Sequence, residues 1–273
     1  MLNVMWTGVV LGTLGALSAE AWPTIWISIE INLISYLIVI SKLITSKQIC
    51  IIYFIVQSVG SLVLLRGGIM TERWRILSFW ITLGLITKTR MAPVHFWGGV
   101  LLIKLSSLPA YLFLTWQKMA PIFLMTLLTP KLLLLALLLI NSLVGSSCSV
   151  RSKNIYVVLF FSGLIHTCWL ISAPMRGAYM YFFLYSLIRL PLFLLSRNIP
   201  ILLLNLAGLP PLTGFFMKLY IIQIMNPWWG MVLILFSAIV LHAYLRAFLL
   251  SAVSSKNKLN VITVAVCGLG CLL

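Results

Sequence analysis

Residues 87–97 read Thr87-Lys88-Thr89-Arg90-Met91-Ala92-Pro93-Val94-His95-Phe96-Trp97, so a lysine stands shortly before a proline inside apolar sequence. Two further stretches combine a lysine with a nearby proline: residues 115–121 (Thr-Trp-Gln-Lys-Met-Ala-Pro) and residues 208–218 (Gly-Leu-Pro-Pro-Leu-Thr-Gly-Phe-Phe-Met-Lys). Proline breaks a helix because it lacks an amide hydrogen and clashes with the preceding turn. A charge beside such a break is costly within a membrane, so we expect these lysines to be functional.

The composition indicates that the chain lies in a membrane. It has 273 residues, of which 62% are hydrophobic and 8% are charged, whereas soluble domains have about 25% charged residues. A spanning helix needs about 20 apolar residues, so the chain has room for roughly ten or eleven spans. We therefore predict an all-α, polytopic protein with a single transmembrane domain over residues 1–273, which excludes a soluble catalytic domain.

The apolar runs are separated by polar residues, glycine or proline. The predicted spans lie near residues 2–19, 24–41, 49–65, 76–104 (interrupted at Pro93), 106–129, 131–147, 155–172, 177–195, 199–224 (interrupted at Pro210), 228–250 and 259–273. Paired interrupted spans in corresponding positions are typical of inverted-repeat transporters.

The charge is strongly positive, with 19 Lys and Arg against three acids, Glu20, Glu30 and Glu72. The basic residues are scattered near span ends, which favours anchoring to anionic lipid. A nucleic-acid partner is excluded because no surface is left outside the bilayer. The five cysteines form no Cys-x-x-Cys pair, so we expect neither a disulfide framework nor a zinc site. The N-terminal sequence resembles no import signal, so we expect synthesis in the compartment where the protein resides.

Glu30 and Lys88 are the first candidate site residues. Glu30 follows Pro23 by seven residues, which places it roughly 10 Å into the bilayer at 1.5 Å per residue. Two opposite charges about 4 Å apart attract by about 4 kcal/mol at an effective dielectric near 20, enough to control which member of the pair carries a proton. We expect a breakable Glu30–Lys88 pair. The alternatives are a snorkelling or protonated structural acid at Glu30 and a permanent structural pair.

Lys118 lies near the middle of its predicted span, three residues before Pro121. Burial favours the neutral form of a lysine, so such a group can gain and lose a proton. Pro121 also frees the carbonyl of Gln117, which must then be satisfied by protein or water. His95 and His166 could relay protons between Lys88, Lys118 and Lys218. For either histidine the alternative is a structural hydrogen-bonding role. Arg189 is left open between function and anchoring.

The motifs taken together resemble the chain 2 family among the antiporter-like membrane subunits of the mitochondrial NADH–ubiquinone oxidoreductase (complex I). The matching stretches are Ser28-Ile29-Glu30-Ile31-Asn32-Leu33, Tyr53-Phe54 with Gln57, Met91 through Trp97, Thr115 through Pro121, Ser162 with His166 and Trp169, Gly208 through Lys218, and Tyr244-Leu245-Arg246. Arg90 departs from the pattern, because the family usually has glycine there. Gly98-Gly99-Val100 also replaces a more usual Val-Pro-Glu.

The resemblance implies an antiporter-like fold of inverted repeats with two broken helices, multi-pass in the mitochondrial inner membrane. It implies that Glu30 and Lys88 form a switch pair, that Lys118 and Lys218 are the central and second-helix lysines, and that His95 and His166 lie near the axis connecting them. The implied activity is proton translocation driven by electron transfer from NADH to ubiquinone.

The same resemblance implies the partners and cofactors. Partners are the other complex I subunits, including neighbouring antiporter-like subunits, and inner-membrane lipids such as cardiolipin. NADH, FMN, iron–sulfur clusters and ubiquinone are expected in the partner subunits, with no cofactor or metal bound by this chain. Two alternatives remain: a free-standing cation/proton antiporter, and a structural membrane subunit that does not pump.

Overall fold

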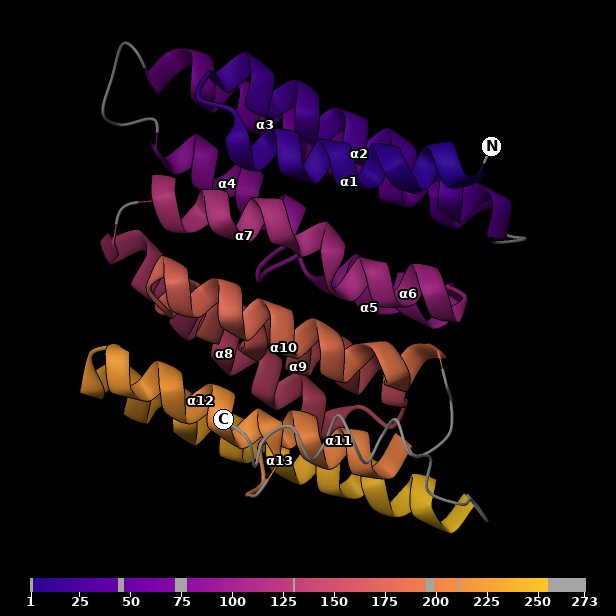
Figure 1. Ribbon diagram of the computed structural model, residues 1–273, viewed down its shortest axis with the longest axis vertical. Helices are drawn as coiled ribbons and strands as arrows, with labels where there is room; N and C mark the ends of the chain where they lie inside the picture. Colours follow the sequence, from indigo (N-terminus) through magenta and orange to yellow (C-terminus); the bar gives the residue numbers. More distant parts are fainter. Residues whose placement is uncertain are drawn as a thin grey trace. The chain divides into compact units, whose positions relative to one another are not determined.

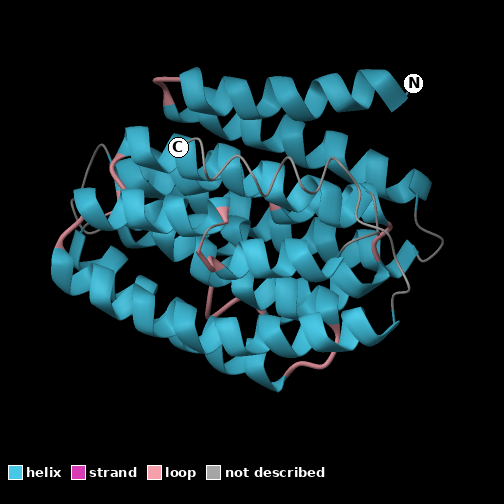
Figure 2. Ribbon diagram, turned by 60° about the horizontal axis from the view of Figure 1, so that its bottom comes forward, coloured by secondary structure: helices cyan, strands magenta, loops and turns pink. Residues whose placement is uncertain are grey.

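The structure is a computed structural model that describes residues 2–43, 47–71, 78–129, 131–194, 199–210 and 212–254. These residues form helices and short loops without a strand (Figure 2). The helices are α1 (Leu2–Ser18), α2 (Trp22–Leu43), α3 (Lys47–Thr71), α4 (Ser78–Thr89), α5 (Phe96–Lys104), α6 (Ser107–Leu114), α7 (Trp116–Leu128), α8 (Lys131–Arg151), α9 (Ile155–Ser172), α10 (Met175–Leu194), α11 (Ile199–Ala207), α12 (Thr213–Ile224) and α13 (Pro227–Ser254). The predicted span at 259–273 lies outside the described residues.

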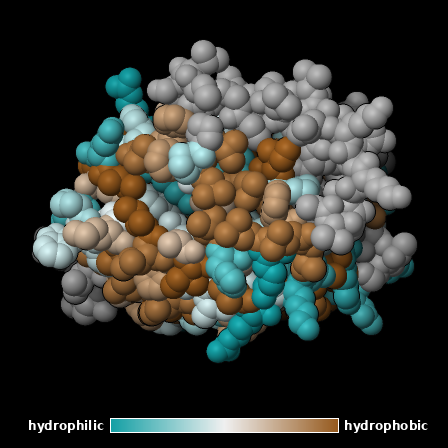
Figure 3. Space-filling view, turned by 90° about the horizontal axis from the view of Figure 1, so that it is seen from below, coloured by the Kyte–Doolittle hydropathy of each residue, from teal (hydrophilic) through white to brown (hydrophobic). Residues whose placement is uncertain are grey.

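The outer sides of the helices are apolar, as contact with lipid requires. Phe96 is 76% exposed and Leu235 is 66% exposed. Figure 3 shows apolar side chains over much of one face, with hydrophilic residues gathered at its edges. Seven spans within the described residues are long and apolar enough to cross a membrane. The prediction of an all-helical, polytopic membrane protein is therefore confirmed.

Three spans are broken into consecutive pairs of helices: α4 with α5, α6 with α7, and α11 with α12. Counted with each pair as one segment, the described residues contain ten helical segments, seven of which include a stretch long and apolar enough to cross a membrane. The breaks near Pro93 and Pro210 were predicted. The break at Thr115 was not, because no proline lies there; Thr115 has φ −113° and ψ −81°, outside the helical region.

The chain divides into two compact units, Met1–Leu137 and Leu138–Leu273. In the first unit α1 packs along α2, α3 packs on α2 and α4, and α7 contacts α4 and α1 (Figure 1). Close approach of α3 and α4 requires glycine at Gly84, where a Cβ atom would lie 2.8 Å from the amide nitrogen of Leu64. Lys88 stands one turn beyond Gly84 on the same face, so this contact directs Lys88 toward α3.

In the second unit α11 packs on α13 and α10, while α9 packs on α13 and α10 (Figure 1). Its spans match those of the first unit in part, since the fifth span is broken in the first unit (α6–α7) and continuous in the second (α13). Each unit has five spans within the described residues, and in each the fourth span is broken, as α4–α5 in the first and α11–α12 in the second. The shared break in the fourth span agrees with the predicted antiporter-like repeats. That the two units act as one transmembrane domain stays a prediction.

Candidate functional site

Lys88 lies in the last turn of α4, immediately before the first break. The helix ends because Arg90 adopts a left-handed conformation, with φ +62°. The amide of Met91 then reaches back to the carbonyl of Ile86 at 3.1 Å. The negative end of the helix dipole favours a cation at this position. Lys88 is 3% exposed, and its Nζ atom has no hydrogen-bond partner.

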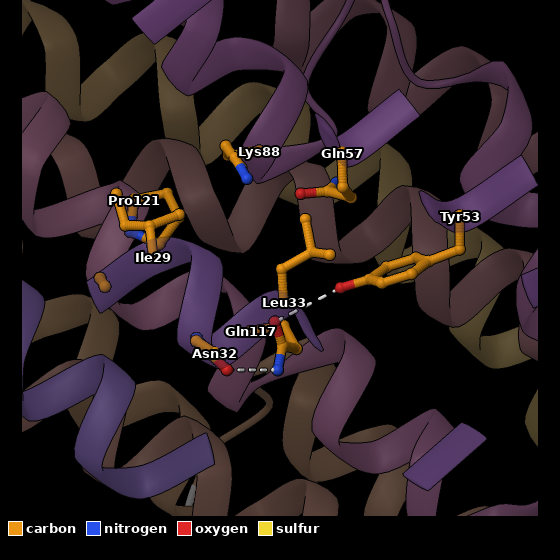
Figure 4. Close-up of a pocket in the computed structure, with 9 residues that line it drawn as sticks. Ile29, Asn32, Leu33, Tyr53, Gln57, Lys88, Gln117 and Pro121 are labelled. Atoms are coloured by element: carbon orange, nitrogen blue, oxygen red, sulfur yellow. Dashed lines mark hydrogen bonds between the residues drawn. The ribbon is translucent and has the colours of Figure 1, made fainter. Parts of the chain in front are cut away.

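A small polar cavity lies beside Lys88 (Figure 4). Its volume is about 10 Å³, room for about one water molecule. Polar side chains from three other helices line it: Asn32, Tyr53, Gln57 and Gln117. Gln117 donates to the side-chain oxygen of Asn32 at 2.9 Å and accepts from the Tyr53 hydroxyl at 3.5 Å. The lysine therefore faces amide and hydroxyl groups.

Glu30 does not form the predicted direct pair with Lys88. The carboxylate interacts electrostatically with Lys88 and with Tyr53, yet the Lys88 ammonium makes no hydrogen bond. The reason lies in helix geometry, because Ile29, Asn32 and Leu33 are the residues of α2 that line the cavity. Glu30 follows Ile29 by about 100° around the helix, so its half-buried side chain leaves in another direction. That Glu30 and Lys88 form a breakable pair stays a prediction.

Lys118 lies on α7 between the break at Thr115 and Pro121. Its side chain is 1% exposed, and its amide donates to the Thr115 carbonyl at 3.0 Å. The neighbouring residue, Gln117, lines the cavity beside Lys88. The α4 segment with Lys88 and the α7 segment with Lys118 therefore meet at one cavity, because α4 and α7 pack on each other.

His95 lies within the first break and is the residue before α5. It is 4% exposed, and its ring lies against Phe96 with centroids 4.1 Å apart. The structure thus places His95 in the break that follows Lys88. Its relay role stays a prediction.

The second unit has a similar arrangement around Lys218. The α11 helix ends at Ala207, and Gly208 follows with φ +82°, a conformation that favours glycine. Lys218 is partly buried on α12 and donates from Nζ to the Ala207 carbonyl at 2.7 Å. A lysine on one half-helix thus satisfies a carbonyl that the break leaves without an intrahelical donor.

His166 shares a cavity with Lys218. This cavity also has a volume of about 10 Å³, and Ser162, Ser237 and Tyr244 contribute polar groups to its lining. His166 Nδ1 lies 2.7 Å from the hydroxyl of Tyr181. The structure therefore brings together two residues that are far apart in sequence and that were predicted to exchange protons.

The chain matches no family model, but individual relatives are similar along most of its length. It is 28% identical over 261 residues to NADH-ubiquinone oxidoreductase chain 2 of Hylobates lar, covering 81% of this chain and 75% of the relative. It is 26% identical over 276 residues to the chain of the same name from Mytilus edulis, covering 92% and 88%. The chain is similar to NADH–ubiquinone oxidoreductase chain 2 over most of its length.

Solved structures share the fold of this chain. A chain of the respiratory complex I from Thermus thermophilus with bound aureothin superposes with a TM-score of 0.82 at 18% identity, covering 100% of this chain and 76% of that one. A chain of the Mrp complex from Dietzia sp. DQ12-45-1b has a TM-score of 0.75 at 16% identity, covering 89% and 59%. These likenesses confirm the antiporter-like fold.

Several residues that contribute to these two sites could not be identified from the sequence. Asn205 near the end of α11 accepts hydrogen bonds from the amide of Gly214 (2.8 Å) and the hydroxyl of Thr213 (2.9 Å), and so ties the two half-helices together. Asn32 and Tyr181 were also unassigned. An asparagine inside an apolar helix was a usable signal, because an amide in a membrane must find partners. The tyrosine carried no such signal. The described residues contain no group of three or more His, Cys, Asp or Glu that could hold a metal ion.

Proposed function

We propose that the chain is a membrane-arm subunit of a respiratory complex I and translocates protons, driven by electron transfer from NADH to ubiquinone in partner subunits. One observation carries the proposal: in each unit a lysine beside a helix break lines a polar cavity with room for about one water molecule. A group that gains and loses a proton next to a hydrated break is what proton transfer within a membrane needs. The similarity to chain 2 proteins supports the assignment to complex I.

The proposed cycle begins at Lys88. A change transmitted from a neighbouring subunit closes or opens the gap between Glu30 and Lys88, two groups that attract by about 4 kcal/mol when about 4 Å apart. The charge on Lys88 then acts on Lys118, whose segment meets the same cavity. In the second unit a proton passes between His166 and Lys218 through their shared cavity. His95 stands at the first break, positioned to exchange a proton there.

The proposal also includes the surroundings of the protein. The chain resides in the mitochondrial inner membrane, contacts neighbouring antiporter-like subunits, and anchors its basic span ends on anionic lipid such as cardiolipin. NADH, FMN, iron–sulfur clusters and ubiquinone belong to partner subunits. This chain supplies the proton-carrying side chains.

Two measurements test the proposal. On a native gel stained for NADH dehydrogenase activity, an antibody against this chain should mark the active band; absence from that band would exclude membership of complex I. In membranes containing the assembled complex, Lys118→Met should lower the number of protons translocated per electron while NADH oxidation and assembly continue. An unchanged ratio in that variant would favour the structural, non-pumping alternative.

The likeness to the Mrp complex chain makes a cation/proton antiporter the second candidate. That activity would not need a redox partner. The purified chain in liposomes should then exchange cations for protons under an imposed pH gradient, whereas the complex I subunit should not.

A further inference from the structure

Arg90 is the residue whose position the proposed cycle does not explain. It is 1% exposed and lies in the break two residues after Lys88, with φ +62°. A side chain in the left-handed region is strained, because Cβ approaches the following carbonyl. Glycine would avoid that strain. A fully buried arginine retained at such a position therefore needs a contact that compensates for both strain and burial.

The compensating contact joins two helix breaks. The Nη1 atom of Arg90 donates to the carbonyl of Phe113. Phe113 lies in the last turn of α6, immediately before the break at Thr115. The last carbonyls of a helix lack intrahelical donors and carry the negative end of its dipole. A guanidinium cation is a suitable partner for such a carbonyl.

A cluster of aromatic rings begins at the same guanidinium. Its central carbon lies 3.7 Å from the centroid of the Phe113 ring, within the range of a cation–π interaction. Phe113 in turn contacts the rings of Tyr53 (6.3 Å) and Trp97 (6.1 Å), and Tyr36 contacts Tyr53 (5.4 Å). Both tyrosines interact electrostatically with Arg90. We call this cluster, Tyr36, Tyr53, Trp97 and Phe113, the aromatic cage.

The aromatic cage connects directly to the lysine cavity. Tyr53 belongs to both, and its hydroxyl donates to Gln117, the residue before Lys118. Tyr36 donates to the Pro109 carbonyl in α6 at 2.8 Å. Arg90 thus contacts Phe113 of α6 directly, and the Phe113 ring in turn contacts Tyr53 of α3 and Trp97 of α5. A shift of the α4–α5 break would therefore act on the α6–α7 break, which precedes Lys118.

We propose that Arg90 is a positioning residue that locks the α4–α5 break to the α6–α7 break, so that a displacement at Lys88 is transmitted to Lys118. This inference deepens the proposed function and rests on it. Arginine suits this role because its charge is permanent and because its planar guanidinium both stacks on a ring and donates hydrogen bonds. A lysine would keep the charge and reach the cage, but without the fork of donors.

The test uses three substitutions in the assembled complex. Arg90→Met keeps a side chain at the strained position without charge; Arg90→Gly relieves the strain and removes the link; Arg90→Lys keeps the charge. Lys42→Met, at an exposed end of α2, removes the same charge without touching the cage and serves as the matched control. Lys118→Met is the reference for lost pumping.

Hydrogen exchange of residues 113–121 measures the link itself. Arg90→Met and Arg90→Gly should speed exchange there about tenfold, the change expected when one charge-assisted hydrogen bond no longer opposes local opening. Arg90→Lys should restore most of the protection, and the control should not change it. Exchange at the wild-type rate in Arg90→Met would overturn the proposal.

The number of protons translocated per electron measures the coupling. A merely structural arginine would change the amount of assembled complex but not this ratio. We expect the ratio to fall in Arg90→Met and Arg90→Gly and to recover in Arg90→Lys. A wild-type ratio in Arg90→Met, in membranes where Lys118→Met lowers it, would overturn the proposal. A wild-type ratio in Lys118→Met would instead overturn the proposed function, and the link would then be judged by hydrogen exchange alone.

Discussion

Gly208→Ala should both destabilise the second break and impair pumping. Gly208 has φ +82°, and a side chain in the left-handed region costs about 1–2 kcal/mol. The added Cβ would also lie 3.0 Å from the Lys218 ammonium, which must then move away from the Ala207 carbonyl that it contacts at 2.7 Å. Hydrogen bonds to charged groups contribute about 1.5–3 kcal/mol, so partial loss brings the total to about 2–4 kcal/mol.

The assay for Gly208→Ala is heat dissociation of the assembled complex, followed on native gels, together with protons translocated per electron. Gly177→Ala is the matched control, because it also replaces a glycine by alanine, but within a helix. The added Cβ would lie 3.6 Å from its nearest neighbour, an ordinary van der Waals distance. The control should be neutral or slightly stabilising, by about 0.5–1 kcal/mol. Equal dissociation temperatures and ratios for Gly208→Ala and wild type would refute the role given to the left-handed glycine and to the Lys218 contact.

Three further substitutions test the rest of the site. Lys88→Met should leave assembly intact, because the Nζ atom has no hydrogen bond to lose, yet should lower protons translocated per electron. Asn205→Ala should lower stability by about 1 kcal/mol through loss of the cap on α12, measured by heat dissociation. Tyr181→Phe removes the hydroxyl 2.7 Å from His166 Nδ1, which should cost about 1 kcal/mol and change the pH dependence of pumping.

Each of the three has a matched control. Lys42→Met removes an exposed lysine from the end of α2 and is the control for Lys88→Met. A lower number of protons translocated per electron in Lys42→Met would show that net charge, and not Lys88 itself, matters. Asn205→Asp keeps the acceptor oxygen at a helix N-terminus and should be tolerated. Equal losses of stability in Asn205→Asp and Asn205→Ala would contradict the capping role of Asn205. Tyr156→Phe, at an exposed tyrosine, should keep the wild-type pH profile. A wild-type pH profile of pumping in Tyr181→Phe would exclude a role of the Tyr181 hydroxyl in proton transfer at His166.

The span pattern could be predicted because hydropathy and proline act locally. The span predicted at 155–172 has the bounds of α9, and the breaks near Pro93 and Pro210 lie where proline and glycine interrupt apolar runs. The break at Thr115 could not be predicted in this way. The backbone leaves the helical conformation at Thr115, two residues after Phe113. Phe113 is bound there by Arg90, a residue from a distant part of the sequence.

The candidate site was predicted only in part. Lys88, Lys118 and Lys218 stand out as charges in apolar sequence, and the structure places each of them beside a helix break. The partners of these lysines did not stand out. Asn32 and Gln117 meet although 85 positions separate them, and which face of α2 turns toward Lys88 depends on how the helices pack. That packing turned Glu30 aside and brought Ile29 and Asn32 to the cavity.

The sequence by itself determined the membrane environment, the helical class, two of the three breaks and the lysines that mark the site, because these follow from composition and from the covalent properties of proline, glycine and lysine. Only the tertiary structure decided which groups meet. It left Lys88 without a hydrogen bond to Glu30, joined His166 to Lys218 in one cavity, and placed Arg90 against Phe113 of the aromatic cage. Contacts of this kind depend on the rotation of one helix against another, which the order of residues along a single helix does not specify.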